Sequence, residues 1–356
     1  MEKEYRPLPY HNCIHASDVL QSFYYLAFHS QWGSKFSNIE KLAGIIAAVG
    51  HDIDHPGVSN QFLVKARDPI AIMYSDASVN EYHHSAHMFS VTLSSQYNIF
   101  SSFSNDEFEE VRRIIIKLIL ATDMGKHFEI LSKFKTKVQS TGFRNLDTQE
   151  NRLLVLEIAL KCGDLNNPSK NQEIAVQWAY CIMEEFYRQG DKERELGFPI
   201  SNFMDRNNSN VAKCQVGFID LLVAPLYGTW ALLSKEDNDN SIMKSNINTN
   251  KKMWQHIANI QADPNFSQMR SFAKSSSSIA SCIVKPSNIP NPPAVPALPE
   301  IFVMRASGKS LVDIPSTHSL HAVPMPELVP PPTTNSSQLS RGESINEEEP
   351  ESESEA

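Results

Sequence analysis

Histidine and aspartate side chains stand at short spacing between His51 and Asn60, where the sequence follows the pattern H-D-x-x-H-x-x-x-x-N. Imidazole and carboxylate groups both ligate metals, and the adjacent His51 and Asp52 can turn toward one cation. The second oxygen of the Asp52 carboxylate can reach another ion, as in paired-metal sites. His55 follows one helical turn later. The segment therefore predicts a metal-dependent hydrolase.

Three other segments supply side chains that could complete such a site. His11 and His15 are spaced i, i+4, which predicts one shared helix face about 6 Å apart, with one binding metal and the other moving a proton. Asp164 precedes an Asn-Asn-Pro turn and is a candidate fourth ligand; the alternative is an ordinary turn residue. Gln215 and Phe218 lie one turn apart and pair an amide with an aromatic ring.

These four segments, in this order, resemble the catalytic domain of the class I 3',5'-cyclic nucleotide phosphodiesterases. The resemblance runs from residue 10 to about residue 233 and includes Val79–His84, Leu120–Met124 and Met183–Glu193. Most of these stretches are closest to the cAMP-specific branch, whereas Gly190–Pro199 is closer to the calmodulin-stimulated branch. No basal calmodulin-binding segment is recognised.

The resemblance implies two divalent metal ions, zinc at a tight site and magnesium or manganese at a second site to which Asp52 would bridge. The residues expected to hold the zinc ion are His15, His51, Asp52 and Asp164. His11 is implied as the general acid that protonates the departing O3' oxygen. Glu185 is expected to orient that acid, with a solvated helix glutamate as the alternative reading.

Other residues take roles around the metals by the same resemblance. His55, Glu81 and Thr122 are expected to hold metal-bound waters, and His83 or His84 is a further candidate. The chemistry implied is hydrolysis of the cyclic phosphodiester by a metal-activated water, which opens the ring to the nucleoside 5'-monophosphate.

The base pocket is implied residue by residue. Gln215 would read the purine edge, Phe218 and Ile182 would sandwich the ring, and Phe186 would line the same pocket. The alternative is that these apolar residues are ordinary core positions. Asn167 suits an adenine-reading pocket, although an Asn there could also cap its turn. The expected substrate is cAMP, with cGMP also possible.

The start of the chain departs from the family pattern. Nine residues precede the Tyr-His-Asn segment, where the family has several helices. We expect a fragment, or a truncated isoform whose uncovered apolar surface needs a protein partner. A second function is therefore a catalytically weak isoform that acts as a regulatory or binding protein, and turnover of cAMP by the purified chain distinguishes the two.

Helical spacing predicts the fold. Ile39, Leu42, Ile46 and Val49 recur at helical intervals before His51. Capping boxes are predicted where Ser78 and Ser104 each precede a glutamate by three residues, and a further helix is predicted over Asp147–Cys162. Strand patterns and Asn-Gly hairpins are absent from the sequence. These patterns favour an all-α domain over residues 1–272, with a deep pocket for two metals.

Composition changes near residue 273. Residues 286–350 hold 13 of the chain's 21 prolines, and the last 16 residues contain seven Glu and one Arg. Such composition cannot support a packed core, so residues 273–356 are expected to be a disordered tail. The tail could tether or regulate the domain, or only solubilise it. With a net charge of −9, the chain shows no basic surface for nucleic acid.

Targeting signals and cysteines bear on location. The first nine residues lack an apolar signal core, and the apolar stretch Leu221–Leu233 is short and interrupted by Pro225 and Gly228, so no membrane span is expected. The five cysteines show neither a disulfide framework nor metal-type spacing. We therefore expect reduced thiols and a cytoplasmic protein.

Overall fold

The computed structural model describes residues 1–233 and 238–262, and this part of the chain contains helices and no strand. The all-α fold class is thereby confirmed. The α-helices are α1 Cys13–Phe28, α2 Asn38–Gly50, α3 Asn60–Ala66, α4 Pro69–Met73, α5 Val79–Thr92, α6 Asn105–Leu120, α7 His127–Gln139, α8 Gln149–Asp164, α9 Gln172–Glu195, α10 Val211–Phe218, α11 Ala224–Trp230 and α12 Asn238–Ala262. The proposed boundary at residue 272 and the tail lie outside the described residues.

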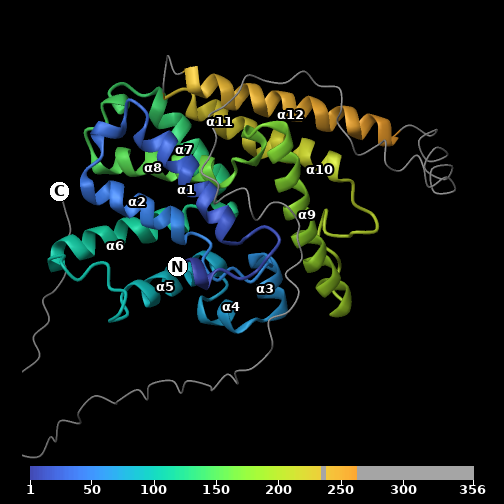
Figure 1. Cartoon of the computed structure of the whole chain (residues 1–356), viewed down its shortest axis with the longest axis horizontal. Helices are drawn as coiled ribbons and strands as arrows, with labels where there is room; N and C mark the ends of the chain where they lie inside the picture. Colours follow the sequence, from blue (N-terminus) through green and yellow to red (C-terminus); the bar gives the residue numbers. More distant parts are fainter. Residues whose placement is uncertain (234–237, 263–356) are drawn as a thin grey trace, which may run out of the picture. The chain divides into compact units, whose positions relative to one another are not determined.

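Helix α8 is the centre of the core. Every residue from Leu153 to Gly163 is buried, so this helix is enclosed on all sides rather than amphipathic. Helices α1, α2, α6, α7 and α11 pack against it (Figure 1). Because α8 ends at Asp164, the packing of α1 and α2 against it brings their own functional residues toward the same end of the core.

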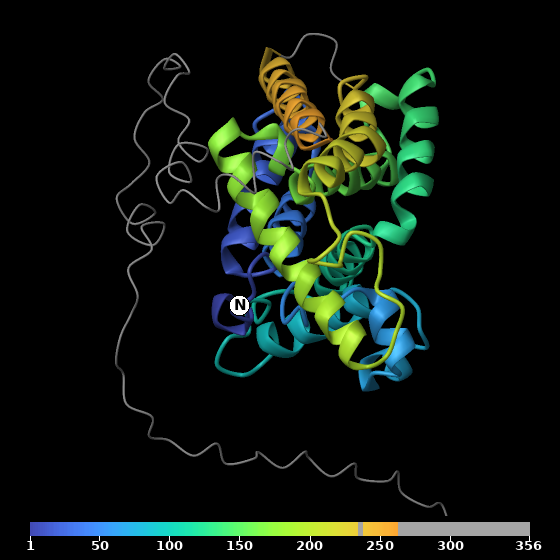
Figure 2. The ribbon, with the colours of Figure 1, turned by 90° about the vertical axis from the view of Figure 1, so that its right-hand side faces the viewer.

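Helix α9 runs along one side of the helical domain, from α10 and α12 at one end toward α3 at the other (Figure 2). Near its C-terminal end, Gln189 exchanges hydrogen bonds with Ser59, the N-cap residue of α3: the Ser59 amide donates to Oε1 at 2.8 Å, and Nε2 donates to the Ser59 hydroxyl at 3.2 Å. The helix therefore ties the two ends of the domain together.

The predicted apolar stripe of α2 is only partly the buried face. Leu42 is 38% exposed, whereas Ala43, Gly44 and Ala47 are buried. A side chain at Gly44 would meet the Phe23 ring at 2.6 Å. Close approach of α1 to α2 thus requires small residues at the contact, and hydrophobicity alone misidentified the face.

One predicted capping box is present and the other is wrong. Ser104 accepts from the Glu107 amide and the Glu107 carboxylate accepts from the Ser104 amide, as expected. Ser78 instead has φ +42° and makes no side-chain cap, and its hydroxyl donates to Asp123 Oδ2 at 2.6 Å. The first turn of α5 is capped from another segment, because Asn60 Oδ1 accepts from the Asn80 amide at 2.8 Å.

The predicted helix over Asp147–Cys162 is displaced by two residues. Thr148 caps the helix by accepting from the Asn151 amide, so α8 starts at Gln149 and continues to Asp164. This places the candidate ligand in the last helical turn rather than in the loop after the helix.

One helical stretch in the described part of the chain, Val211–Trp230, is long and apolar enough to cross a membrane by length and composition alone. Pro225 does not interrupt it as predicted, because it occupies the first turn of α11, where its missing N–H is tolerated. Val223, Leu226 and Trp230 in this stretch are buried in the core. Core helices pass the same test, so the finding is weak evidence for a span.

Gly190→Ala should destabilise the domain. Alanine normally favours a helix over glycine by about 1 kcal/mol, but a Cβ at this buried position of α9 would meet the Met204 carbonyl oxygen at 1.9 Å. We expect a net loss of about 1–3 kcal/mol in the free energy of unfolding, measured by urea denaturation. Gly228→Ala on the exposed side of α11 meets nothing within 4 Å and should be neutral or stabilising. Equal effects of the two changes would contradict this packing.

Candidate metal and acid–base centre

Four side chains, from α1, from the turn that follows α2 and from the last turn of α8, converge at one end of the core. One ligand atom each from His15, His51, Asp52 and Asp164 lies within 4.8 Å of the others. His51 Nε2 lies 3.0 Å from Asp52 Oδ2 and 3.4 Å from Asp164 Oδ1, while His15 Nε2 lies 3.3 Å from both carboxylate oxygens. The structure therefore brings together all four residues that were predicted from the sequence to be metal ligands.

Local structure explains how each of these ligands is placed. The Asn12 side chain accepts from the Ile14 and His15 amides, so α1 begins at Cys13 and carries His15 in its first turn. His51 is the C-cap residue of α2, and its Nδ1 lies 3.0 Å from the Ala48 carbonyl, which fixes Nε2 as the outward-facing nitrogen. Asp164 comes from the last turn of α8.

The donor set fits a divalent cation. His15 Nε2 and His51 Nε2 are buried, and neither makes a hydrogen bond within the described residues. Burial opposes ionisation of Asp52 and Asp164, but the neighbouring imidazoles outweigh it and lower the pKa of both carboxyls. Two imidazoles and two ionised carboxylates around one point are ligands that suit zinc and related ions.

His11 faces this cluster but lies outside the helix. It precedes the N-cap Asn12, so the predicted shared helix face with His15 is wrong. Its Nε2 lies 4.0 Å from Asp52 Oδ2, and its Nδ1 lies 2.5 Å from Glu185 Oε1. Glu185 also accepts from the Tyr10 and His11 amides, at 2.9 and 3.1 Å. Glu185 is 3% exposed, so the solvated alternative does not hold.

Electrostatics favour a protonated His11. Burial opposes its charge, but the charge of Glu185 and the hydrogen bond to it outweigh burial and raise the pKa of His11. The pKa of Glu185 is lowered, again because His11 outweighs burial. His55 stacks on the His11 ring with centroids 4.0 Å apart, and burial together with the charge of His11 lowers the pKa of His55. The surroundings thus favour the charged form of His11 and the neutral form of the stacked His55.

The structure separates His83 from its neighbour His84. His84 is buried, its Nδ1 lies 2.7 Å from the Ile53 carbonyl, and its Nε2 lies 3.7 Å from Asp52 Oδ1. Burial lowers the pKa of His84 to about 4, so the ring is neutral near pH 7. His83 turns to Asp54 instead, with Nε2 2.8 Å from Oδ2. Of the two candidates, only His84 faces the cluster.

Glu81 and Thr122 make their hydrogen bonds to residues outside the four-residue cluster. The side-chain nitrogen Nδ2 of Asn60 donates to Glu81 Oε2 at 2.9 Å. Burial, reinforced by the charge of Asp123, raises the pKa of Glu81 to about 7. The Thr122 hydroxyl donates to the Ile119 carbonyl at 2.7 Å. Their roles in holding water stay predictions.

Four of the five residues predicted for the base pocket lie on two adjacent helices. Ile182 and Phe186 are half-buried one turn apart on α9, and α10, which packs against α9, carries buried Gln215 and half-buried Phe218. A π-helical turn, Ile219–Val223, follows Phe218 directly. Asn167 does not cap its turn: its Nδ2 donates to the Tyr10 hydroxyl at 2.6 Å. These contacts leave the nucleotide-binding roles as predictions.

The chain is similar to known proteins over most of its described length. Residues 10–246 match the 3'5'-cyclic nucleotide phosphodiesterase family. The chain belongs to this family.

Individual relatives carry cAMP in their names. The probable 3',5'-cyclic-AMP phosphodiesterase pde-4 of Caenorhabditis elegans is 41% identical over 260 residues, which cover 72% of this chain and 38% of that protein. The 3',5'-cyclic-AMP phosphodiesterase 4C of Rattus norvegicus is 44% identical over 233 residues, which cover 64% of this chain and 44% of that protein. The chain thus spans less than half the length of these relatives.

Two aromatic residues next to this cluster were missed by sequence reasoning. The Tyr10 ring lies 4.7 Å from the His15 ring and 5.4 Å from Trp178, measured between centroids. Trp178 is also 6.1 Å from His15 and lies two helical turns before Glu185 on α9. That heptad spacing was the available signal, since it places Trp178 and Glu185 on one helix face.

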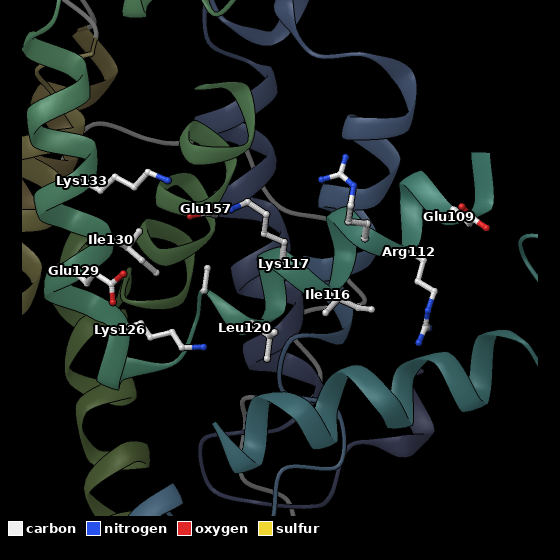
Figure 3. A pocket seen from close by; sticks show the side chains of 12 residues that line it. Glu109, Arg112, Ile116, Lys117, Leu120, Lys126, Glu129, Ile130, Lys133 and Glu157 are labelled. Carbon is white, nitrogen blue, oxygen red and sulfur yellow. Dashed lines mark ion pairs between the residues drawn. The ribbon is translucent and has the colours of Figure 1, made fainter. Parts of the chain in front are cut away.

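A groove of about 660 Å³ lies elsewhere on the phosphodiesterase domain, between α6 and α7 (Figure 3). Its basic side chains are Arg112, Arg113, Lys117, Lys126 and Lys133, and Lys117 Nζ lies 2.6 Å from Glu157 Oε1. None of the residues predicted for the metal or base sites lines this groove. Metal-dependent hydrolysis requires metal ligands, and the groove contains none of the clustered His and Asp residues. The candidate reaction site is therefore the cluster and not this groove.

Glu185→Gln should shift the pH profile. The raised pKa of His11 keeps it protonated to higher pH, and the neutral amide removes the charge that raises it. The alkaline limb of kcat/KM for cAMP should therefore move to lower pH, with about 10–100-fold lower kcat. Glu184→Gln is the matched control, because the adjacent Glu184 pairs with exposed Arg188 and Arg206. An unmoved limb in Glu185→Gln would contradict the role of Glu185.

Proposed function

We propose that this chain hydrolyses 3',5'-cyclic nucleotides to nucleoside 5'-monophosphates, with cAMP as the preferred substrate, and thereby ends cyclic nucleotide signalling. The observation that carries the proposal is the four-residue cluster of imidazoles and carboxylates with His11 facing it, backed by Glu185. Family membership and the cAMP-specific names of the relatives support the same substrate class.

Metal ions would be held by residues already in position. His15, His51, Asp52 and Asp164 would hold a zinc ion, and Asp52 would also be a ligand to a second ion, magnesium or manganese. When bound, the ions supply positive charge to the phosphoryl oxygens and lower the pKa of water.

The protein's own residues then handle the leaving group. His11 carries a proton on Nε2, the ring nitrogen that faces the cluster, and donates it to O3' as the phosphodiester bond breaks. Glu185 accepts from the opposite ring nitrogen and from two backbone amides, so the imidazole is held in one orientation. His55 stacks on the His11 ring and Trp178 packs against the His15 ring, so both imidazoles are restricted in their motion.

The substrate base is assigned to the α9–α10 side. Gln215 would orient the purine edge, while Phe218 and Ile182 would stack on its two faces and Phe186 would line the same space. Asn167 donates to the Tyr10 hydroxyl and so holds the Tyr10 side chain in place. We assign to Asn167 an indirect role in binding an adenine ring, exerted through Tyr10. We also place the protein in the cytoplasm, consistent with four unbridged cysteines in the described residues.

The decisive experiment measures turnover by the purified chain with zinc and magnesium present. We expect release of 5'-AMP from cAMP, a lower kcat/KM for cGMP, and loss of both activities on chelation. No hydrolysis of either nucleotide by a folded, metal-loaded chain would overturn the proposal.

Phe218→Ala should act on binding more than on chemistry. Stacking on a base is worth about 1–3 kcal/mol, so KM for cAMP should rise about 5-fold to 150-fold while kcat changes less. Leu221→Ala, an exposed position one turn further on, is the control and should leave KM unchanged. A variant at Phe218 with normal KM and lost kcat would show that the base lies elsewhere.

A further inference from the structure

We propose that Asp54, His83 and His87 form a separate metal site that binds one zinc-like transition-metal ion. One ligand atom from each residue lies within 4.8 Å of the others, and none of the three belongs to the four-residue cluster at the candidate reaction site. The inference does not depend on the proposed hydrolysis, because it concerns metal binding alone.

The geometry of the two histidines is typical of a metal-binding helix. His83 and His87 are spaced i, i+4 on α5, so their rings stand on one helix face, with centroids 5.8 Å apart. Two histidines at this spacing bind zinc in helical zinc motifs. Asp54, from the turn after α2, meets them with Oδ2 2.8 Å from His83 Nε2.

A second carboxylate lies next to one of the three residues. Glu4 Oε2 is 3.2 Å from His87 Nε2, so it accepts from or shields that imidazole at the edge of the site. Mixed imidazole and carboxylate ligands suit zinc, whereas calcium and magnesium prefer oxygen ligands throughout. The side chains of His83 and His87 are 18% and 27% exposed, which leaves the site open to an ion from solvent.

Arg6 orients the site and limits its charge. Its Nε donates to Asp54 Oδ1 at 2.6 Å, which leaves Oδ2 directed toward His83. Hydrogen bonds of this kind hold ligating carboxylates in place. The Arg6 charge offsets one of the two carboxylates, Asp54 and Glu4, so a net negative charge remains to attract a cation.

Occupancy would tie the site to the reaction centre through the backbone. Asp54 lies two residues after Asp52, and His83 directly precedes His84, whose Nε2 faces Asp52. An ion held by Asp54, His83 and His87 would clamp α5 to the turn that presents Asp52. Zinc should therefore raise the thermal stability of the folded chain in a concentration-dependent way.

The test titrates the full chain with Co²⁺, which reports coordination through its visible absorption, and counts bound ions by elemental analysis. His87→Ala should bind one ion fewer per chain at saturation of the wild-type site, with affinity there reduced at least about 10-fold. The visible band of that ion should disappear, while cAMP turnover without added excess zinc stays at the wild-type level. Circular dichroism verifies that the variant is folded.

Two further variants make the result decisive. His256→Ala removes an exposed histidine near the end of α12 and should match the wild type in ion count and spectrum. Glu4→Gln should weaken the same ion without abolishing it. Wild-type ion count and spectrum in His87→Ala would overturn the proposal, as would equal losses in His87→Ala and His256→Ala. Failure of cAMP hydrolysis alone would contradict the proposed function but not the metal site at Asp54, His83 and His87.

Discussion

Asp52→Asn should nearly abolish hydrolysis of cAMP. Asp52 Oδ2 lies within 3.3 Å of Nε2 of both His15 and His51, and Oδ1 faces His84, so this one carboxylate lies between the two groups of candidate ligands. An amide keeps the shape but removes the charge that two cations require. If the metals supply about 4 kcal/mol of transition-state stabilisation, kcat should fall about 10³-fold.

The measurement is kcat at saturating cAMP together with metal content by elemental analysis. Asp205→Asn is the control, because Asp205 forms an exposed ion pair with Arg194 and should leave kcat unchanged. Near-normal hydrolysis by Asp52→Asn with its metals still bound would exclude a mechanism that depends on a bridging carboxylate.

His11→Ala should keep both metals and the nucleotide but lose about 10²–10⁴ in kcat, the usual worth of a placed general acid. His11 is the imidazole that combines a raised pKa with a ring nitrogen 4.0 Å from Asp52, and Glu185 holds it from behind. Alanine leaves the departing O3' without a proton donor.

A substrate analogue separates the acid from a structural role. On a nitrophenyl phosphodiester, whose leaving group needs no proton, the loss in His11→Ala should shrink sharply. His29→Ala, at an exposed histidine after α1, should behave as the wild type on both substrates. An equal loss on cAMP and on the analogue would show that His11 acts as a structural group or a metal ligand.

Chemistry-bearing residue types could be recognised without the structure because they sit in short local patterns. The adjacency of His51 and Asp52 and the apolar run ahead of Asp164 are properties of a few neighbouring residues. Helix content was likewise predictable, and the box at Ser104 formed as expected because its two partners lie three residues apart. No local pattern shows that Asp164 approaches Asp52, however: only the family resemblance implied it, since that distance depends on how α8 packs against α1 and α2.

Tertiary packing decided which of several equivalent side chains faces the centre. His83 and His84 are adjacent and chemically identical, yet the rotation of α5 turns only His84 toward Asp52. Leu42 is more apolar than Ala43, yet close contact between helices buries the smaller residue.

Long-range hydrogen bonds decided the rest. The first turn of α5 is capped by Asn60 rather than by its own Ser78, and His11 is held by Glu185, 174 residues away, rather than by a helix face shared with His15. The residues and their chemistry are local properties of the sequence. The orientation of each side chain follows from contacts between segments that are distant along the chain, and only the packed core specifies those contacts.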